Sequence, residues 1–335
     1  MILAGDIGGT NTRLALFEVH GSSVAMRQSA DYRNREHPTV EHIIDDFVAK
    51  VHVPVDLVSL GVAGAVIENR VTGQNLPWNV DAVLIERSLQ LPRVVLLNDL
   101  VALAYGLGAL KESDLTTLHA APPLASGNCA VIAAGTGLGE AGLLRGIDGF
   151  VPFPSEGGHS DFAPNDETEA ALYLYLRTRF GHVSYERVLS GQGIENIYEF
   201  LRDTQRYPED GALATELAAT TDRAALISRH ALASSCAICE ETLNIFARVL
   251  GAEAGNIALR LLATGGVYIG GGIAPKISQC LLHPRFTDAF RAKGRMQPLL
   301  EKVPVYLVTN EHTGLIGAAV FGLKQLAQQT EALHA

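Results

Sequence analysis

Near its N-terminus the chain has the stretch Gly5-Asp6-Ile7-Gly8-Gly9-Thr10-Asn11-Thr12-Arg13, with apolar runs at 2–3 and 14–17 on either side. This pattern predicts a strand, a glycine-rich turn and a second strand, which together form a β-hairpin. Adjacent glycines let the backbone approach a ligand and direct N–H groups toward it, as phosphate binding requires. A tight turn that Asp6 and Thr10 merely cap is the simpler interpretation of such a short motif.

A second stretch repeats this design between residues 129 and 145. A buried strand is expected over 129–134, then the turn Gly135-Thr136-Gly137-Leu138-Gly139, then a return strand over 141–144. Two hairpins of one design indicate two related lobes that each offer a phosphate-binding turn to one ligand. Neither turn matches a Walker A loop, or the Gly-x-Gly-x-x-Gly fingerprint that opens a helix in dinucleotide-binding proteins.

The composition excludes several classes of protein. At 335 residues the chain is long enough for two domains, and its net charge of -10 argues against nucleic acid or an anionic membrane surface as partner. No signal peptide and no membrane-spanning apolar run is visible. Four cysteines do not make a disulfide framework, and Cys236-Ala237-Ile238-Cys239 has no second metal-binding pair nearby. We therefore expect a cytoplasmic protein with reduced thiols.

The run Val94–Leu97 predicts a central strand that is buried on both faces, and it ends abruptly in Asn98 and Asp99. Ligands of open α/β sheets bind beyond the carboxyl ends of the strands, so Asp99 lies where chemistry is expected. Capping of the following helix is the competing explanation, because Asn and Asp are favoured there. The residues alone leave both explanations open.

The segment Glu156-Gly157-Gly158-His159 is too rich in glycine for the interior of a helix or strand. A metal site is not favoured, because it would have only two ligands and neither lies on a helix. A carboxylate and an imidazole are also the acceptor and donor that a polyhydroxylated ligand needs. Farther along, Glu186 lies in the segment 183–191. From the residues alone, the simpler interpretation is that Glu186 and Arg187 belong to a solvated surface.

Helical patterns cover much of the rest of the chain. Helices are expected over about 39–50, 81–89, 167–180 and 194–203, long ones over about 212–219 and 222–262, and a last one over about 313–328. The segment Gly265–Lys276 predicts a strand, a triple glycine and the start of a helix.

The first turn resembles the first phosphate motif of sugar kinases in the hexokinase, actin and Hsp70 superfamily. The segments around Asn98-Asp99, Glu156–His159 and Glu186 narrow the resemblance, which covers nearly the whole chain, to bacterial ATP-dependent glucokinases. Most kinases of the wider ROK group carry a cysteine-rich zinc motif after the corresponding histidine, and this chain lacks it. The resemblance implies an α/β protein with the two-lobed actin-like ATPase (ribonuclease H-like) fold. Its ligand cleft would lie between a small α/β domain, 1–110 plus about 301–330, and a larger α+β domain, 111–300.

The resemblance also implies roles for individual residues. Asp99 would be the general base, and Asp6 would hold Mg²⁺ through a water molecule. The sugar would be bound by Asn75, Asn98, Asp99, Glu156, His159 and Glu186. ATP would be bound by Asp6, Gly8, Gly9, Thr10, Asn11, Gly135, Thr136, Gly137, Gly271 and Gly272. For Asn75, a loop anchored by a buried Trp78 is an equally good interpretation.

The implied reaction is phosphorylation of D-glucose at its 6-hydroxyl with Mg-ATP, the first step of glycolysis, and the family suggests a homodimer. A kinase of another hexose or an amino sugar is the alternative among enzymes. A non-catalytic sugar-responsive regulator usually carries an N-terminal helix-turn-helix, whereas the first strand here is expected from Ile2. An actin-like or chaperone-type ATPase would have no use for Glu156, His159 and Glu186.

Overall fold

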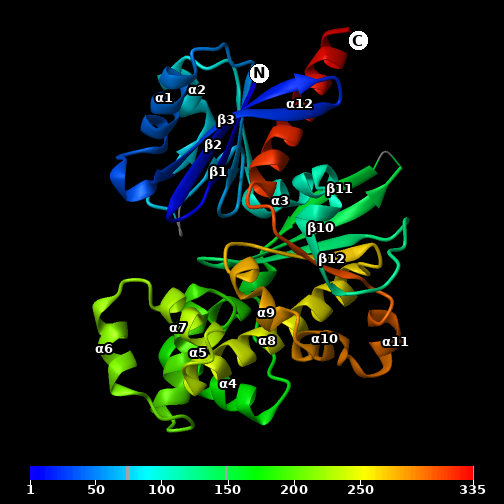
Figure 1. The fold of residues 1–335 in the computed structure, drawn as a ribbon. Coiled ribbons are helices and arrows are strands. Elements are labelled where there is room, and N and C mark those ends of the chain that lie inside the picture. Colours follow the sequence, from blue (N-terminus) through cyan, green and yellow to red (C-terminus); the bar gives the residue numbers. More distant parts are fainter. Residues whose placement is uncertain (73–75, 148, 335) are drawn as a thin grey trace. The chain divides into compact units, whose positions relative to one another are not determined.

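The protein, seen here in a computed structural model, is described over residues 1–72, 76–147 and 149–334. The chain divides into two compact units. Unit 1 comprises Met1–Asp114, Pro152–Pro154 and Asn310–Ala335, and unit 2 comprises Leu115–Val151 and Ser155–Thr309. Each unit has one large sheet with helices packed on it (Figure 1). No helix in the described part of the chain is long and apolar enough to cross a membrane.

Unit 1 is built on a five-stranded sheet with the order β3-β2-β1-β4-β7. Its elements are β1 (Ile2–Ile7), β2 (Asn11–His20), β3 (Ser23–Arg33), α1 (Val40–Val51), β4 (Leu57–Val62), β5 (Arg70–Val71), β6 (Val80–Asp81), α2 (Ala82–Leu89), β7 (Val94–Asn98), α3 (Asp99–Gly106) and α12 (Thr313–His334). Strand β1 pairs antiparallel with β2 and parallel with β4, so Asp6 lies between Arg13 and Gly61. The predicted first hairpin is confirmed.

Both faces of the sheet are buried at β1, which explains why this strand is apolar at successive positions. Leu3 packs in the cluster that contains Ile43 and Phe47 of α1. Its neighbour Ile2 points to the other face and packs in the cluster that contains Leu315 of α12. The sheet of unit 1 is therefore a middle layer between α1 on one face and α12 on the other. Polar side chains lie at or near the carboxyl ends of β1 and β7.

Helices α3 and α12 lie side by side in unit 1 and approach each other closely at a glycine (Figure 1). A β-carbon on Gly317 would lie 1.7 Å from the carbonyl oxygen of Ala102. Gly317→Ala is expected to lower the free energy of unfolding by about 1 to 3 kcal/mol, because the two backbones must separate. Urea unfolding measures this loss. Gly108→Ala is the control, since nothing lies within 4 Å of its β-carbon position; an equal loss there would contradict the explanation.

Unit 2 is built on a six-stranded sheet with the order β11-β10-β9-β12-β13-β8. Its strands are β8 (Leu115–His119), β9 (Cys129–Ala134), β10 (Leu138–Gly146), β11 (Gly149–Ser155), β12 (Gly266–Gly270) and β13 (Val305–Val308). Its α-helices are α4 (Glu167–Phe180), α5 (Gly191–Asp203), α6 (Gly211–Ala219), α7 (Arg223–Leu232), α8 (Ala237–Leu261), α9 (Ser278–Leu281), α10 (Pro284–Arg291) and α11 (Gln297–Leu300). β9 and β10 form the predicted second hairpin, with Ala134 opposite Leu138.

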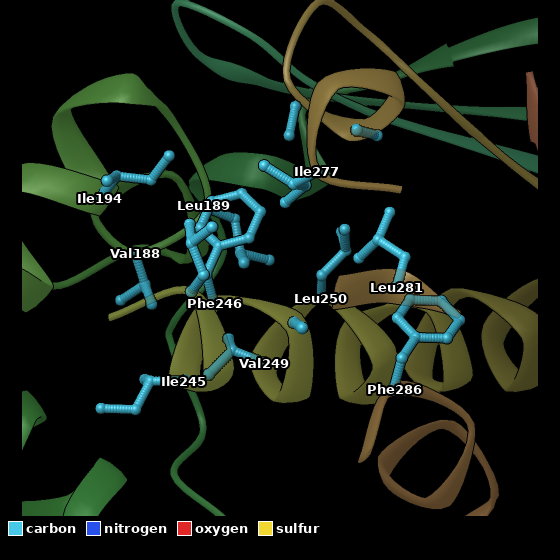
Figure 2. Packing of buried hydrophobic residues seen from close by; sticks show 14 of the residues in the cluster. Val188, Leu189, Ile194, Ile245, Phe246, Val249, Leu250, Ile277, Leu281 and Phe286 are labelled. Carbon is cyan, nitrogen blue, oxygen red and sulfur yellow. The ribbon is translucent and has the colours of Figure 1, made fainter. Parts of the chain in front are cut away.

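The core of unit 2 is organised around α8. Phe246 and Leu250 project from this helix toward Leu189 and Ile277, and Phe286 of α10 packs farther along it (Figure 2). The helix expected over 222–262 is in fact two helices, α7 and α8. The chain turns between them at Ser234, which has the left-handed φ of 50° and cannot continue a helix.

The two sheets share one design. In unit 1 the hairpin β1–β2 is extended by the parallel strands β4 and β7. In unit 2 the hairpin β9–β10 is extended by the parallel strands β12 and β13. The sequence similarity of the two glycine-rich turns thus reflects a repeated architecture, with each turn at the same place in its sheet.

Candidate active site

The first glycine-rich turn is closed by its own backbone and held by one buried side chain. The N–H of Gly8 donates to the carbonyl of Asn11 at 3.0 Å. The Nδ2 of Asn34 donates to the carbonyl of Gly8 at 2.7 Å, and its Oδ1 accepts the hydroxyl of Thr12 at 2.8 Å. Thr10 remains exposed at the tip. The turn is therefore a fixed structure whose outer polar groups face solvent.

Sequence reasoning missed Asn34, because a single asparagine after a strand carries no distinctive signal. Asn34→Ala is expected to lower the free energy of unfolding by about 1 to 3 kcal/mol, because it leaves the buried Thr12 hydroxyl without a partner. Chemical denaturation measures the loss. Arg35→Ala, at an exposed neighbouring position, should leave the free energy of unfolding unchanged. Equal effects of the two variants would argue against a stabilising role of the Asn34 hydrogen bonds.

Asp6 is half-buried at the end of β1. Burial raises the pKa of its carboxyl group, and the Arg13 guanidinium opposes part of that rise. Its Oδ2 lies 3.7 Å from the position that a side chain on Gly314 would occupy, so the start of α12 leaves space beside it. Among the described residues, no group of three or more His, Cys, Asp and Glu side chains is placed to hold a metal ion. Asp6 would thus bind a metal with oxygen atoms supplied by water or a ligand.

Asn98 and Asp99 lie at the end of β7 and the start of α3, as predicted. The Oδ1 of Asn98 accepts the N–H groups of Leu100 and Val101, and its Nδ2 donates to the carbonyl of Gly64 at 3.0 Å. Asn98 is therefore the N-cap of α3. Asp99 is half-buried beside it, and its Oδ1 accepts the N–H of Leu100 at 3.0 Å. β7 is the edge strand of its sheet, so the prediction of a central strand was wrong, although the strand is buried as predicted. The carboxylate is held at the carboxyl end of this strand, and ligands of such sheets bind beyond the carboxyl ends of the strands.

The second glycine-rich turn has the triple glycine of unit 2 beside it. The N–H of Gly135 donates to the carbonyl of Gly137 at 2.8 Å, and the N–H of Ile273 donates to the carbonyl of Ala134 at 3.1 Å. The backbone nitrogen of Gly272 lies 4.0 Å from the position that a side chain on Gly135 would occupy. Unit 2 therefore brings together the candidates Gly135, Thr136, Gly137, Gly271 and Gly272.

The start of α5 also meets this turn, which sequence reasoning did not predict. The N–H of Gly191 donates to the carbonyl of Gly135 at 2.9 Å. Ser190 is the N-cap: its hydroxyl accepts the N–H of Gly193 at 3.0 Å. The positive end of a 13-residue helix thus lies at a candidate phosphate-binding turn. A serine followed by glycine before an amphipathic run was the available signal.

Glu156, His159 and Glu186 come together in unit 2. The imidazole of His159 lies between the two carboxylates, with its Nε2 3.9 Å from Oε2 of Glu156 and its Nδ1 3.9 Å from Oε1 of Glu186. The other oxygen of Glu186 is anchored, since Oε2 accepts the N–H of Leu138 at 2.9 Å. We call these three side chains the acid–imidazole cluster.

The distances within the acid–imidazole cluster are too long for hydrogen bonds between its members. The side chains of Glu156 and His159 are about half exposed, and that of Glu186 is 23% exposed. Each polar group therefore keeps capacity for an outside partner, and hydroxyl groups, which both donate and accept, suit this alternation of acceptor and donor.

The candidates divide between the two units. Unit 1 holds Asp6, Gly8, Gly9, Thr10, Asn11, Asn98 and Asp99, and unit 2 holds the second turn, the triple glycine and the acid–imidazole cluster. Asn75 lies outside the described residues.

Comparisons with known proteins agree with this arrangement. A family model described as Glucokinase matches residues 3–325. The glucokinase of Trichormus variabilis is 40% identical, over 96% of this chain and 98% of its own length. A relationship of this extent covers both units and both glycine-rich turns.

Solved structures give the fold class. The glucokinase of an Antarctic psychrotroph has a TM-score of 0.81 and 32% identity, over 96% of this chain and 98% of that one. A ROK family glucokinase from Streptomyces griseus, in complex with glucose and AMPPNP, has a TM-score of 0.65 and 21% identity, over 96% of this chain and 99% of that one. These neighbours have the two-lobed actin-like ATPase fold, so the expected fold class is confirmed. The chain belongs to the glucokinase family, and its activity is the ATP-dependent phosphorylation of glucose.

Proposed function

We propose that the protein transfers the γ-phosphoryl group of ATP to the 6-hydroxyl of D-glucose, with Asp99 as the general base. The observation that carries the choice of a sugar is the acid–imidazole cluster, whose polar groups are near one another yet not hydrogen-bonded to one another. The Streptomyces griseus relative was crystallised with glucose and AMPPNP, which supports these two substrates.

Each residue has one task in this proposal. Asp99 accepts the proton of the hydroxyl group as the phosphoryl group transfers to it. Glu156, His159 and Glu186 bind sugar hydroxyls and fix the orientation of the ring. Asn98 presents its amide beside Asp99, although both amide atoms already bond to the backbone, so we assign it mainly to holding the start of α3. Asn75 keeps its proposed place near the sugar.

The two glycine-rich turns bind the phosphate groups of ATP through their backbone N–H groups and the hydroxyls of Thr10 and Thr136. Asn11 adds a polar side chain at the first turn, and Gly271 and Gly272 leave room for the adenosine. The exposure of both threonines supports this assignment, because their hydroxyls face solvent rather than the core.

Mg²⁺ fits the residues present. This ion keeps several of its waters and takes one or two protein carboxylates together with substrate phosphates. Asp6 supplies one half-buried carboxylate with space beside Gly314. Bound Mg²⁺ supplies neutralisation of the charge on the transferring phosphoryl group. The carboxylate of Asp6 would orient the water molecules of the ion.

We also propose that the protein acts in the cytoplasm, at the first step of glycolysis, as a homodimer. Four cysteines without a disulfide are consistent with a reducing compartment. The net charge of -10 fits a partner set of small molecules rather than nucleic acid or membrane. The homodimer rests on the family resemblance, and light scattering of the purified protein tests it.

A coupled assay of ADP release tests the proposed substrate. The purified protein with Mg-ATP is given glucose, other hexoses and N-acetylated hexosamines. We expect strong activity with glucose and little with the others. Preference for another sugar would keep Asp99 and the acid–imidazole cluster but overturn glucose as the substrate. Sugar binding without ADP release would favour a regulator instead.

A further inference from the structure

Unit 2 buries two glutamates side by side. Glu140 on β10 is 1% exposed and Glu253 on α8 is fully buried. Both carboxyl groups approach one atom, Nη1 of Arg260: Oε2 of Glu140 lies 3.7 Å from it and Oε1 of Glu253 lies 2.8 Å from it. Two adjacent carboxylates cannot both stay charged in such a place without strong compensation, so the hydrogen-bond donors around each one decide which is ionised.

Glu253 has a full set of donors. Its Oε1 accepts from Nη1 of Arg260 and its Oε2 from Nδ2 of Asn256, both at 2.8 Å. The same Nδ2 of Asn256 also donates to the hydroxyl of Tyr185 at 2.9 Å, which joins Tyr185 to Glu253 through Asn256. Both oxygens of Glu253 thus accept hydrogen bonds from side chains around it.

Glu140 has no such set. Its Oε1 has no hydrogen-bond partner, and its Oε2 lies 3.7 Å from Nη1 of Arg260, beyond hydrogen-bonding distance. A buried carboxyl group beside a carboxylate forms a hydrogen bond only if it carries a proton and donates it. Burial, and then the charge of Glu253, raise the pKa of Glu140 to about 8, against an opposing effect of Arg260.

None of the other charged groups described around the pair donates a hydrogen bond to Glu140. Lys293 donates from Nζ to Oδ1 of Asn256 at 2.7 Å, and burial lowers its pKa. Glu169 adds another carboxylate in this region and pairs with Arg248 at 3.6 Å. Arg260 is 46% exposed and already engaged with Glu253. Glu140 is thus left with Glu253 as its available acceptor.

This buried pair lies beneath the acid–imidazole cluster. The Oε2 of Glu140 lies 2.0 Å from the position that a β-carbon on Gly157 would occupy, so its carboxyl group is packed against the backbone between Glu156 and His159. Tyr185 immediately precedes Glu186, and its N–H donates to the carbonyl of Ser160 at 3.1 Å. Glu140 and Glu253 thus contact both segments that present the cluster.

We propose that Glu140 is a positioning residue for sugar binding: it donates a hydrogen bond to Glu253, and this buried pair supports the two segments that hold the acid–imidazole cluster. The inference rests on the proposed role of that cluster in binding glucose. Loss of this proton gives Glu140 a negative charge beside Glu253. Repulsion between the two carboxylates pushes Glu140 against Gly157 and displaces the segment 156–159.

The pH dependence of KM for glucose tests the proposal. With a pKa of about 8, KM should rise about tenfold between pH 7 and pH 9, because each pH unit above the pKa makes the protonated form tenfold rarer. The value of kcat at saturating glucose should change much less. A KM that stays flat to pH 9 would overturn the proposal.

Two substitutions separate the proton from the packing. Glu140→Gln keeps the shape and supplies a permanent N–H donor, so its KM should match the wild type at pH 7 and lose the alkaline rise. Glu140→Ala removes the donor and the support, so its KM should be raised at both pH values. Glu167→Gln, at an exposed position on α4, is the matched control and should keep the alkaline rise. If the KM of Glu140→Gln still rises at alkaline pH as in the wild type, the rise comes from another titrating group.

Infrared spectroscopy detects the proton without any catalytic assay. A carbonyl band of a protonated carboxyl group should be present in the wild type at pH 7, fall to about half at pH 8 and to about a tenth at pH 9, and be absent from Glu140→Gln. Absence of this band from the wild type would overturn the inference and leave the sugar assignment intact. If Glu156→Ala leaves the KM for glucose unchanged, the sugar assignment fails, whatever the band shows, and the positioning role fails with it.

Discussion

Replacing Asp99 with alanine is expected to lower kcat by about 10² to 10⁴-fold and to change the KM for glucose far less. The carboxylate lies at the end of β7, where α3 begins, and a backbone N–H fixes one of its oxygens. In the proposed mechanism, removal of the general base raises the barrier of the chemical step, while the proposed sugar-binding cluster in unit 2 is left intact. Steady-state kinetics with glucose and Mg-ATP measures both constants.

Asp45→Asn is the matched control for Asp99→Asn. Asp45 is exposed on α1 in the same unit, so the two substitutions make the same chemical change. The control should keep wild-type turnover, and thermal unfolding should show that the Asp99 variants stay folded. Turnover like that of the wild type in both Asp99 variants would remove the residue from the mechanism.

Gly137→Ala is expected to lower kcat/KM for glucose by about 10²-fold, because a displacement of roughly 1 Å in a positioning group has an effect of that size. A β-carbon at Gly137 would lie 2.3 Å from Oε2 of Glu186, the oxygen that accepts the N–H of Leu138. The methyl group therefore displaces Glu186 from His159. A residue of the second turn, proposed to bind phosphate, would in this way alter recognition of the sugar.

A double-mutant cycle shows whether the effect passes through Glu186. In a Glu186→Ala background, Gly137→Ala should have little further effect on the KM for glucose, since the displaced carboxylate is already gone. Gly211→Ala is the control, because nothing lies within 4 Å of its β-carbon position. Additive losses in the cycle would mean that Gly137 acts on the nucleotide alone.

Local patterns predicted much of the fold. Both hairpins follow from short apolar runs around glycine-rich turns, and the helix that begins after Thr39 follows from its capping residue and spacing. The end of β7 at Asn98 was visible because an apolar run stops at two polar residues. These features depend on neighbours in the sequence, which periodicity reports directly.

Features that depend on distant residues were not predictable in the same way. Asn34 acts on a turn more than twenty residues before it, and Glu140 on β10 meets Glu253 on α8 at the guanidinium of Arg260. A glutamate in a strand sequence gives no sign that its side chain will be buried against another acid. The break between α7 and α8 was also missed, because Ser234 has no glycine or proline beside it to signal a turn.

Unit 1 takes its last helix from the other end of the chain, and this has a consequence for its synthesis. Until the ribosome has passed Thr313, the face of the N-terminal sheet formed by Ile2, Ala4 and Phe17 lacks its cover from α12. The ribosome adds about 5–20 residues per second, so the roughly 200 residues between Asp114 and Thr313 take on the order of 10–40 s to make. Unit 2 lies within that interval and is complete first. We therefore expect the nascent N-terminal sheet to expose apolar surface that chaperones can shield until α12 is made.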